Sequence, residues 1–267
     1  MIKKFLSILC VCGFFLMACS DFEYSPNQAF DKDSPVDLNA KSLARLQNIE
    51  NDDTVKFIVF GDPQKSANEL DEFIAKVNTM KNVDFAILAG DISEFGLLQE
   101  TKWVALELEQ LKIPHFAVIG NHDLLAKGDA VFKRMFGELN YSFAYDGVKF
   151  ICHNTNGREY KFNGLVPDIN WLQQELKPQT GVESYVAISH IRPFSPDFDT
   201  NLDIPYTDVF NAQPKFLASF HAHDHGYGEF FPNNSRVPFV VTTNIGNKGF
   251  ILATIVNNKI SYERINY

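Results

Sequence analysis

The chain has 267 residues, of which 45% are hydrophobic, so it is neither a disordered chain nor one too small to bury a sizeable core. The part of the chain that follows residue 50 has a length typical of one domain. The net charge of −9 argues against the broadly basic surface that nucleic-acid binding needs.

The N-terminus is typical of a targeting segment rather than a folded element. A short basic start precedes an apolar stretch, Phe5–Met17, that is too short to span a bilayer well. The stretch ends in Leu16-Met17-Ala18-Cys19, which resembles a bacterial lipobox. This resemblance implies that residues 1–18 are a lipoprotein signal peptide and that Cys19 is lipidated. An ordinary secretory signal that contains a cysteine is the alternative.

A lipidated Cys19 places the protein in the bacterial cell envelope, with the membrane as a partner through the lipid anchor. Ser20 resembles the outer-membrane sorting pattern, and Asp21 is a weaker sign of surface export. The periplasmic and the outer face both stay open. After loss of the signal, Cys152 is the only free cysteine left, so no intramolecular disulfide is expected. Cys152 lies in an apolar run and is predicted to be a buried small hydrophobe.

The region from residue 19 to residue 50 is predicted to be a tether, with a short helix near 38–49, and the domain is predicted to span 51–267. In the first half of the domain, apolar runs alternate with helical segments. We expect strands near 55–60, 83–89 and 115–119, and helices near 67–80, 98–112 and 129–137. In the second half we expect strands near 141–146, 148–153, 184–189, 215–220, 226–231, 237–242, 249–256 and 259–264, and a helix near 168–176. The predicted fold class is α/β, with two packed sheets and helices outside.

Five polar clusters follow separate apolar runs of the predicted sheets. They are Gly61-Asp62-Pro63-Gln64, Gly90-Asp91, Gly120-Asn121-His122-Asp123, Ser189-His190 and His221-Ala222-His223. Each cluster alone is equally well explained as a polar turn or a helix cap. Because strand ends converge at the edge of a sheet, together they predict one site of carboxylate, amide and imidazole groups, which suits divalent metal ions. Two such ions, about 3.5–4 Å apart, can hold both the attacking and the leaving oxygen of a phosphate ester.

The order of these clusters resembles that of the calcineurin-like metallophosphoesterase superfamily, from about Phe57 to Phe250. The resemblance implies a two-sheet β-sandwich flanked by helices in four α/β/β/α layers. It also implies a role for each matching residue. Asp62, Gln64 and His223 would bind a first metal, Asp91 would bridge both, and Asn121, His190 and His221 would bind the second. His122 would stay off the metals and act near the leaving group, and Asp123 would orient His122 by accepting a ring N–H.

Two positions depart from the family pattern. Gln64 stands where the family usually has His, and Phe220 stands where Gly precedes His-x-His. A Gln carbonyl oxygen is a harder ligand than imidazole and favours Mn²⁺ or Mg²⁺ over Zn²⁺, so the two divalent ions are left open among Mn, Fe, Zn and Mg. Asp224 and His225 match no family ligand and are expected to have loop or supporting roles.

The segment 191–214 has four prolines and little periodicity, so it is predicted to be a lid or an ordinary long loop. Arg192 at its start could hold a substrate phosphate with two hydrogen bonds or could brace the loop, and both readings stay open. His115 is expected to be structural, and His153 and Asn154 are weak candidates for the pocket wall.

The sequence therefore predicts an enzyme that hydrolyses a phosphate monoester or diester, a small-molecule substrate, with a hydroxide that bridges two metals. A metal-dependent nuclease is one alternative, although no nucleic-acid partner is expected from the acidic charge. A catalytically impaired envelope lipoprotein that acts as a binding module is another, because of Gln64 and Phe220. A serine hydrolase is disfavoured because no Gly-x-Ser-x-Gly turn is present.

Overall fold

A computed structural model describes residues 28–49 and 53–267. The predicted signal peptide, the lipidation site Cys19 and the start of the predicted tether lie outside these residues. Within them, no helix combines the length and the apolar character needed to cross a bilayer.

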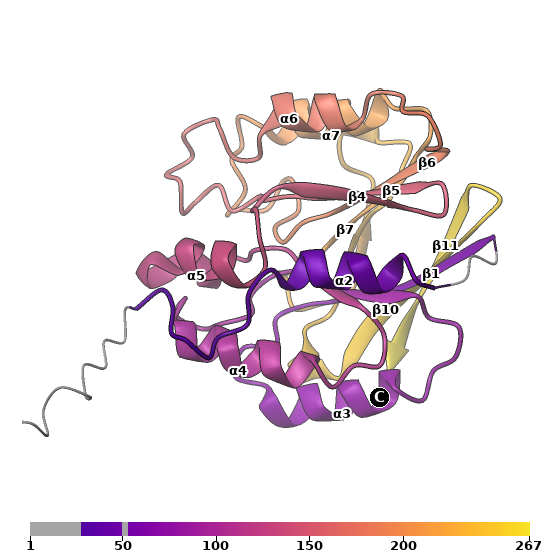
Figure 1. Cartoon of the computed structure of the whole chain (residues 1–267). Coiled ribbons are helices and arrows are strands. Elements are labelled where there is room, and N and C mark those ends of the chain that lie inside the picture. The colour runs from indigo at the N-terminus through magenta and orange to yellow at the C-terminus, as the bar shows by residue number, and fades with distance from the viewer. Residues whose placement is uncertain (1–27, 50–52) are drawn as a thin grey trace, which may run out of the picture.

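Two sheets lie face to face, as predicted, with helices on both outer sides (Figure 1). The first sheet has five strands in the order β11 (Lys259–Asn266), β10 (Gly249–Val256), β1 (Thr54–Phe60), β2 (Phe85–Leu88) and β3 (His115–Ala117). The second has six in the order β4 (Tyr141–Tyr145), β5 (Val148–Cys152), β6 (Ser184–Ile188), β7 (Phe216–His221), β9 (Phe239–Val241) and β8 (Gly228–Phe230).

Helices cover the outer face of each sheet. The helices associated with the first sheet are α2 (Leu38–Leu46), α3 (Ala67–Val77), α4 (Leu98–Leu108) and α5 (Gly128–Met135). The second sheet is covered by α6 (Ile169–Glu175) and α7 (Asp203–Asn211). Short 3-10 turns follow some strands: η1 (His122–Lys127), η2 (Pro232–Asn234) and η3 (Ile245–Asn247).

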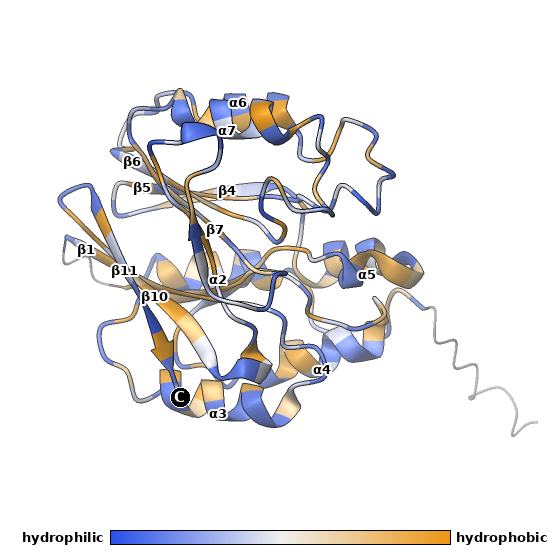
Figure 2. Ribbon diagram, turned by 180° about the vertical axis from the view of Figure 1, so that it is seen from behind, coloured by the Kyte–Doolittle hydropathy of each residue, from blue (hydrophilic) through white to orange (hydrophobic). Residues whose placement is uncertain are grey.

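Three hydrophobic layers hold the four layers of structure together. In β1, Ile58 and Phe60 face the helices, whereas Phe57 and Val59 face the space between the sheets. This alternation arises because successive side chains of a strand point to opposite faces. Since both faces of β1 are buried here, the sequence Phe57–Phe60 is apolar throughout. Figure 2 shows hydrophobic residues running along the strands while the helices are striped. Between the sheets, Phe57 packs on Phe85 and Phe150 with ring centroids 5.6 and 5.1 Å apart.

The parallel strands decide where functional residues can meet. β1, β2 and β3 run parallel in the first sheet, and β5, β6, β7 and β9 run parallel in the second. Their carboxyl ends therefore open onto common edges, where the connecting loops gather. In open α/β sheets this is the edge at which ligands bind.

The predicted boundary between tether and domain at residue 50 is wrong for the described part. Leu38 and Leu46 of α2 are buried in the core, and Asn39 bonds the backbone of Ala117 in both directions. Ser42 donates to the carbonyl of His115. The helix α2 is thus part of the domain, because it shields the edge strand β3.

The segment 191–214 contains the helix α7, which the sequence reading missed. Pro205 is its third residue, where a missing N–H costs nothing because the first backbone N–H groups of a helix have no internal partner. Phe198, Tyr206 and Phe210 are fully buried in the layer under α7. These aromatics of the segment therefore belong to the core rather than to a lid.

Candidate metal and phosphate site

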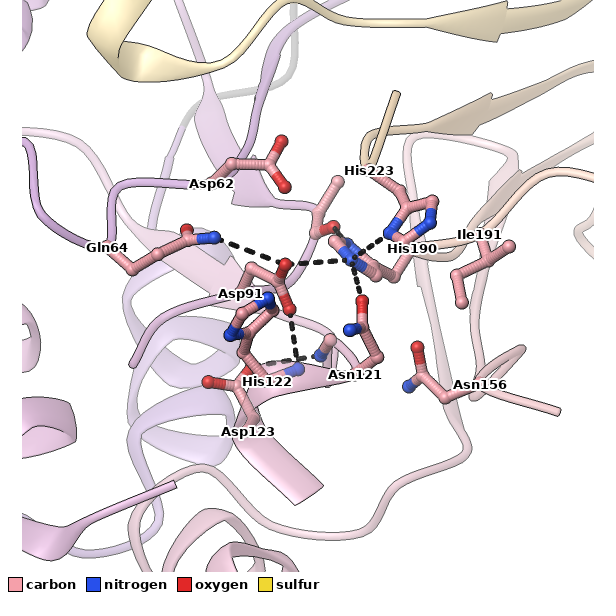
Figure 3. Close-up of polar contacts among 12 residues, drawn as sticks. Asp62, Gln64, Asp91, Asn121, His122, Asp123, Asn156, His190, Ile191 and His223 are labelled. Atoms are coloured by element: carbon pink, nitrogen blue, oxygen red, sulfur yellow. Dashed lines mark hydrogen bonds and ion pairs between the residues drawn. The ribbon is translucent and has the colours of Figure 1, made fainter. Parts of the chain in front are cut away.

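The loops after five parallel strands bring the predicted polar clusters together. Figure 3 shows Asp62, Gln64, Asp91, Asn121, His190 and His223 grouped around one space. Two of the carboxylates and two histidines near it have left-handed backbones: Asp62 at φ 55°, Asp91 at φ 57°, His223 at φ 68° and His225 at φ 58°. Such a backbone is unfavourable for residues other than glycine and is concentrated at functional sites, where the surrounding fold maintains it.

Two glycines allow the loops to approach closely. A Cβ on Gly90 would lie 2.5 Å from Nδ1 of His190, and one on Gly120 would lie 2.1 Å from the backbone nitrogen of Asp91. Either contact would push strand-end loops apart. Glycine therefore precedes Asp91 and Asn121 in the sequence because a larger residue would not fit between the loops at this edge of the sheet.

Four electron-pair donors converge on one point. The Nε2 atom of His190 lies 3.2 Å from Oδ2 of Asp91, 3.0 Å from Oδ1 of Asn121 and 3.3 Å from Nδ1 of His223. His190 uses Nδ1–H to donate to the carbonyl of Ala89 at 2.7 Å, so its Nε2 carries the lone pair in the neutral ring. His223 likewise directs Nε2 to the carboxylate of Asp197 at 3.0 Å.

This arrangement stabilises positive charge at the point of convergence. Burial lowers the pKa of His190, but the Asp91 carboxylate more than reverses this and raises it to about 10. Burial disfavours the charged form of Asp91, yet the neighbouring His190 and His122 keep its pKa below the usual range. Burial and the charge of His190 lower the pKa of His223. A carboxylate, an amide oxygen and two imidazoles at these distances fit a divalent cation.

A second group of donors lies beside the first and shares Asp91. Both carboxylate oxygens of Asp62 are buried without a hydrogen-bond partner among the described residues, and so is Oε1 of Gln64. Gln64 donates from Nε2 to Oδ2 of Asp91 at 3.3 Å. Nε2 of His225 lies 3.6 Å from Oδ1 of Asp62. Buried carboxylate oxygens without a partner are costly, and a cation would satisfy them. The donors present therefore fit a second divalent ion.

His221 does not join either group, contrary to the sequence prediction. Its Nδ1 lies 2.9 Å from the hydroxyl of Ser189 and its Nε2 lies 2.9 Å from the hydroxyl of Ser219. The ring is fully buried and stacks on Phe239. His221 is the last residue of β7 and points to the helix-covered face, opposite to Phe220. Both of its nitrogens are thus used inside the core.

His223 and His225 take the two positions that the sequence reading gave to His221 and His223. The His-x-His pattern at the site is therefore displaced by two residues, and His225, to which the sequence assigned a loop or supporting role, becomes a candidate ligand. Ala222, a small residue, then precedes the pattern, so Phe220 is no departure from it. Because histidines stand at 221, 223 and 225, the sequence fits a His-x-His pattern either at 221 and 223 or at 223 and 225.

His122 lies beside these groups with one ring nitrogen already occupied. Its backbone N–H donates to Oδ1 of Asp91 at 3.0 Å, and its Nδ1 lies 2.8 Å from the carbonyl oxygen of Glu94. Because a carbonyl only accepts, Nδ1 carries the proton. The Glu94 carboxylate is 3.8 Å from the same nitrogen. Nε2 of His122 is thus the atom left to exchange a proton with a ligand.

Asp123 does not orient His122, contrary to the sequence prediction. Its two oxygens accept from the backbone N–H groups of Ile92, Ser93 and Gly120 and from the Ser93 hydroxyl, at 2.8–3.2 Å. Burial and the nearby charge of Asp91 raise the pKa of Asp123 to about 6. Asp123 therefore joins the loops after β2 and β3, and the Glu94 carbonyl holds the His122 ring.

Arg192 is directed away from the converging donors. Its Nε bonds Oδ2 of Asp224 at 2.6 Å, and its guanidinium lies over the ring of Phe230. The sequence reading missed a different cation: Arg158 pairs with Oδ1 of Asp197 at 2.8 Å, and Asp197 bonds His223. Of the remaining candidates, His153 is buried and bonds the hydroxyl of Tyr206 at 2.9 Å.

Comparisons with known proteins identify the family and the fold. A family model described as calcineurin-like phosphoesterase matches residues 55–241. The fold is similar to a dimetal phosphatase from Danio rerio, with 13% identity, a TM-score of 0.63 and coverage of 79% of this chain and 96% of that one. It is similar to a purple acid phosphatase from yellow lupin (Lupinus luteus) seeds, with 13% identity, a TM-score of 0.64 and coverage of 80% of this chain and 51% of that one.

A calcineurin-like phosphoesterase from Bacillus subtilis is also similar, with 13% identity, a TM-score of 0.52 and coverage of 80% of this chain and 90% of that one. No curated protein matches the chain in sequence.

Proposed function

The chain belongs to the calcineurin-like phosphoesterase family, and on this premise we propose that it hydrolyses a phosphate ester of a small molecule with two divalent metal ions. The observation that carries the proposal is the convergence of Asp91, Asn121, His190 and His223 around one point, beside a buried Asp62 carboxylate that accepts no hydrogen bond from the described residues. A buried carboxylate without a hydrogen bond is costly, and a bound cation would offset that cost while using the converging nitrogen and oxygen atoms as ligands.

The two donor groups would hold one ion each. One ion would be bound by Asn121, His190 and His223, and the other by Asp62, Gln64 and His225, with the Asp91 carboxylate between them. Gln64 gives Nε2 to Asp91 in the structure, so its amide would turn by half a rotation to offer Oε1. The harder Gln oxygen favours Mn²⁺, Fe²⁺ or Mg²⁺ at this position over Zn²⁺.

When bound, the ions would lower the pKa of a coordinated water, so that hydroxide is available near neutral pH, and would offset phosphoryl charge. The protein would supply the remaining functions. His122, protonated at Nε2, would donate a proton to the leaving oxygen while the Glu94 carbonyl and carboxylate stabilise the charged ring. No covalent intermediate on a side chain is needed.

We also propose that Cys19 carries a lipid that anchors the domain in the cell envelope. Support comes from the lipobox-like Leu16-Met17-Ala18-Cys19 alone. Metabolic labelling with an alkyne fatty acid tests it. The full chain should be labelled and recovered with membranes, and Cys19→Ser should abolish the label. Label that persists in Cys19→Ser would rule out this anchor.

Metal reconstitution tests the hydrolase proposal. The full chain would be stripped of metal with a chelator, reloaded with Mn²⁺, Fe²⁺, Zn²⁺ or Mg²⁺, and assayed on phosphate monoesters and diesters. Hydrolysis should return only with metal. Asp91→Asn should lose both metal and activity, whereas Asp129→Asn, a surface carboxylate paired with Lys133, should lose neither. Failure to bind metal would favour a binding module, and salt-dependent DNA cleavage would favour a nuclease.

A further inference from the structure

A cavity of about 490 Å³ opens next to the proposed metal site, between α3 and α4. Its walls come from the loop that follows β1, the loop that follows β2 and the facing sides of the two helices. Figure 1 shows these helices side by side on the outer face of the first sheet. The volume lies within the range of sites for small ligands.

Two residues that line the cavity also contact the proposed catalytic groups, Gln64 through its side chain and Glu94 through its backbone carbonyl. Gln64 lines the cavity and bonds Asp91 at 3.3 Å. Glu94 lines it as well and holds Nδ1 of His122 through its carbonyl at 2.8 Å. His122 is the residue assigned to the leaving oxygen. A phosphate ester at the metal site would therefore have its alcohol part beside the mouth of this cavity.

The lining is mostly apolar and carries exposed aromatic rings. Leu70, Ile92 and Val104 form apolar wall, and Phe95 and Trp103 lie at the opening. Phe95 is 55% exposed and Trp103 is 63% exposed, an unusual position for large aromatic side chains in a domain whose other rings are mostly buried. Aromatic rings at the mouth of an apolar cavity can sandwich a flat or bulky apolar group.

The charges of the lining restrict the ligand further. Asp71, Glu94, Glu100 and Glu107 all face the cavity, and Lys65, the one basic residue among the described lining residues, is paired with Glu94. An alcohol part that carried a second phosphate would meet net negative charge. A neutral or cationic group would not, and a cation would gain from the carboxylates and from the aromatic faces.

We propose that this cavity binds the alcohol part of the substrate, and that this part is ring-sized, apolar or aromatic, neutral or cationic, and free of further phosphate. The inference rests on the proposed phosphoesterase function. It deepens that function by naming the substrate class: monoesters or diesters of such alcohols, rather than nucleotides or sugar bisphosphates.

The first test compares substrates in the metal-loaded full chain. The enzyme should prefer phenethyl phosphate to glycerol phosphate, which lacks a ring. Trp103→Ala should lower kcat/KM for phenethyl phosphate by about tenfold or more, the effect of losing one aromatic contact, and leave glycerol phosphate unchanged. Leu106→Ala is the matched control, because Leu106 is an exposed apolar residue of the same helix outside the cavity lining. Equal losses on both substrates, or none, would overturn the proposal.

The second test does not depend on turnover. The chain has two tryptophans, so in Trp171→Phe the fluorescence of Trp103 reports on the cavity alone. Titration with phenethyl alcohol should change the emission saturably in the chelator-treated protein, and glycerol should not. Saturable binding without ester hydrolysis would refute the hydrolase proposal but leave the assignment of the cavity as a binding site intact. Hydrolysis without binding, and without a Trp103 effect, would refute the cavity assignment alone.

Discussion

Removing the side chain of His225 should release metal from the protein, whereas removing that of His221 should destabilise the fold. The two histidines belong to the same alternating pattern, but the structure gives them opposite surroundings. His225 is half-exposed and lies 3.6 Å from the buried carboxylate of Asp62, which accepts no hydrogen bond from the described residues. His221 is fully buried between two serine hydroxyls.

The expected magnitudes follow from those surroundings. His225→Gly is the appropriate variant because φ at this position is 58°, which glycine adopts freely and alanine does not. An exposed ion pair contributes about 0–1 kcal/mol to stability, so the fold should be nearly unaffected. Removing a residue that only supports a metal ligand weakens metal binding roughly 10–100-fold. Removing His225, a proposed ligand, should therefore weaken metal binding at least as much.

His221→Ala should behave in the opposite way. Two hydrogen bonds of about 1 kcal/mol each are lost, and a cavity forms against Phe239, for a total of about 2–4 kcal/mol. For a domain of this size, that lowers Tm by roughly 5–15 °C. Metal bound per folded chain should stay near the wild-type value.

Elemental analysis after gel filtration and thermal unfolding with and without chelator would measure both quantities on the same samples. His225→Gly should keep its Tm in chelator and lose the increase in Tm that added metal gives the wild type. The reasoning fails if His225→Gly retains full metal while His221→Ala loses it at an unchanged Tm. The motif would then be in the register expected from the sequence.

Three further outcomes are expected. His122→Ala should keep its metal and lose about 10²–10⁴-fold in turnover; full activity would reject its assignment as the proton donor. Asp197→Ala should weaken metal binding about 10–100-fold, because it frees the ring of His223, while Arg158→Ala on the same carboxylate should not. His115→Phe should reduce acid sensitivity: burial lowers the pKa of His115 to about 4 from 6.5, so the unfolded chain binds more protons between these values and stability falls as pH falls. Chemical unfolding at pH 7 and pH 5 should show the wild type losing about 2 kcal/mol more than the variant, and equal losses would exclude His115 as the cause.

The fold class was predictable because its strands are buried on both faces. Continuous apolar runs such as Phe57–Phe60 and Phe85–Leu88 mark such strands without reference to any neighbour. Two features of the helices lack a comparable local signal: the existence of α7, which was missed, and the packing of α2, which was predicted as a helix but assigned to the tether. Pro205 and a mixed composition hide α7, and the attachment of α2 depends on Asn39 and Ser42 bonding backbone groups about 75 residues further along the chain.

The site was predictable to the level of loops but not to that of atoms. The sequence order brings Asp62, Asp91, Asn121 and His190 to one edge, and the structure has them there. The choice among the three alternating histidines depends on where β7 ends. Since a strand directs alternate side chains to opposite faces, His221 goes with Ser219 to the helix-covered face, and only residues beyond the strand are free to turn toward the site.

Backbone strain explains why local sequence preferences do not predict the conformation of the loops at the site. Asp62, Asp91, His223 and His225 all have positive φ, a conformation that costs each residue free energy and is uncommon for residues other than glycine. The parallel strands, the glycines at 90 and 120 and the Asp123 link between two loops maintain it together. A protein that used these loops only as connections would gain stability by relaxing them. The left-handed backbone at Asp62, Asp91 and His223 is therefore part of the arrangement that brings their side chains to one space, as a cation site requires (Figure 3).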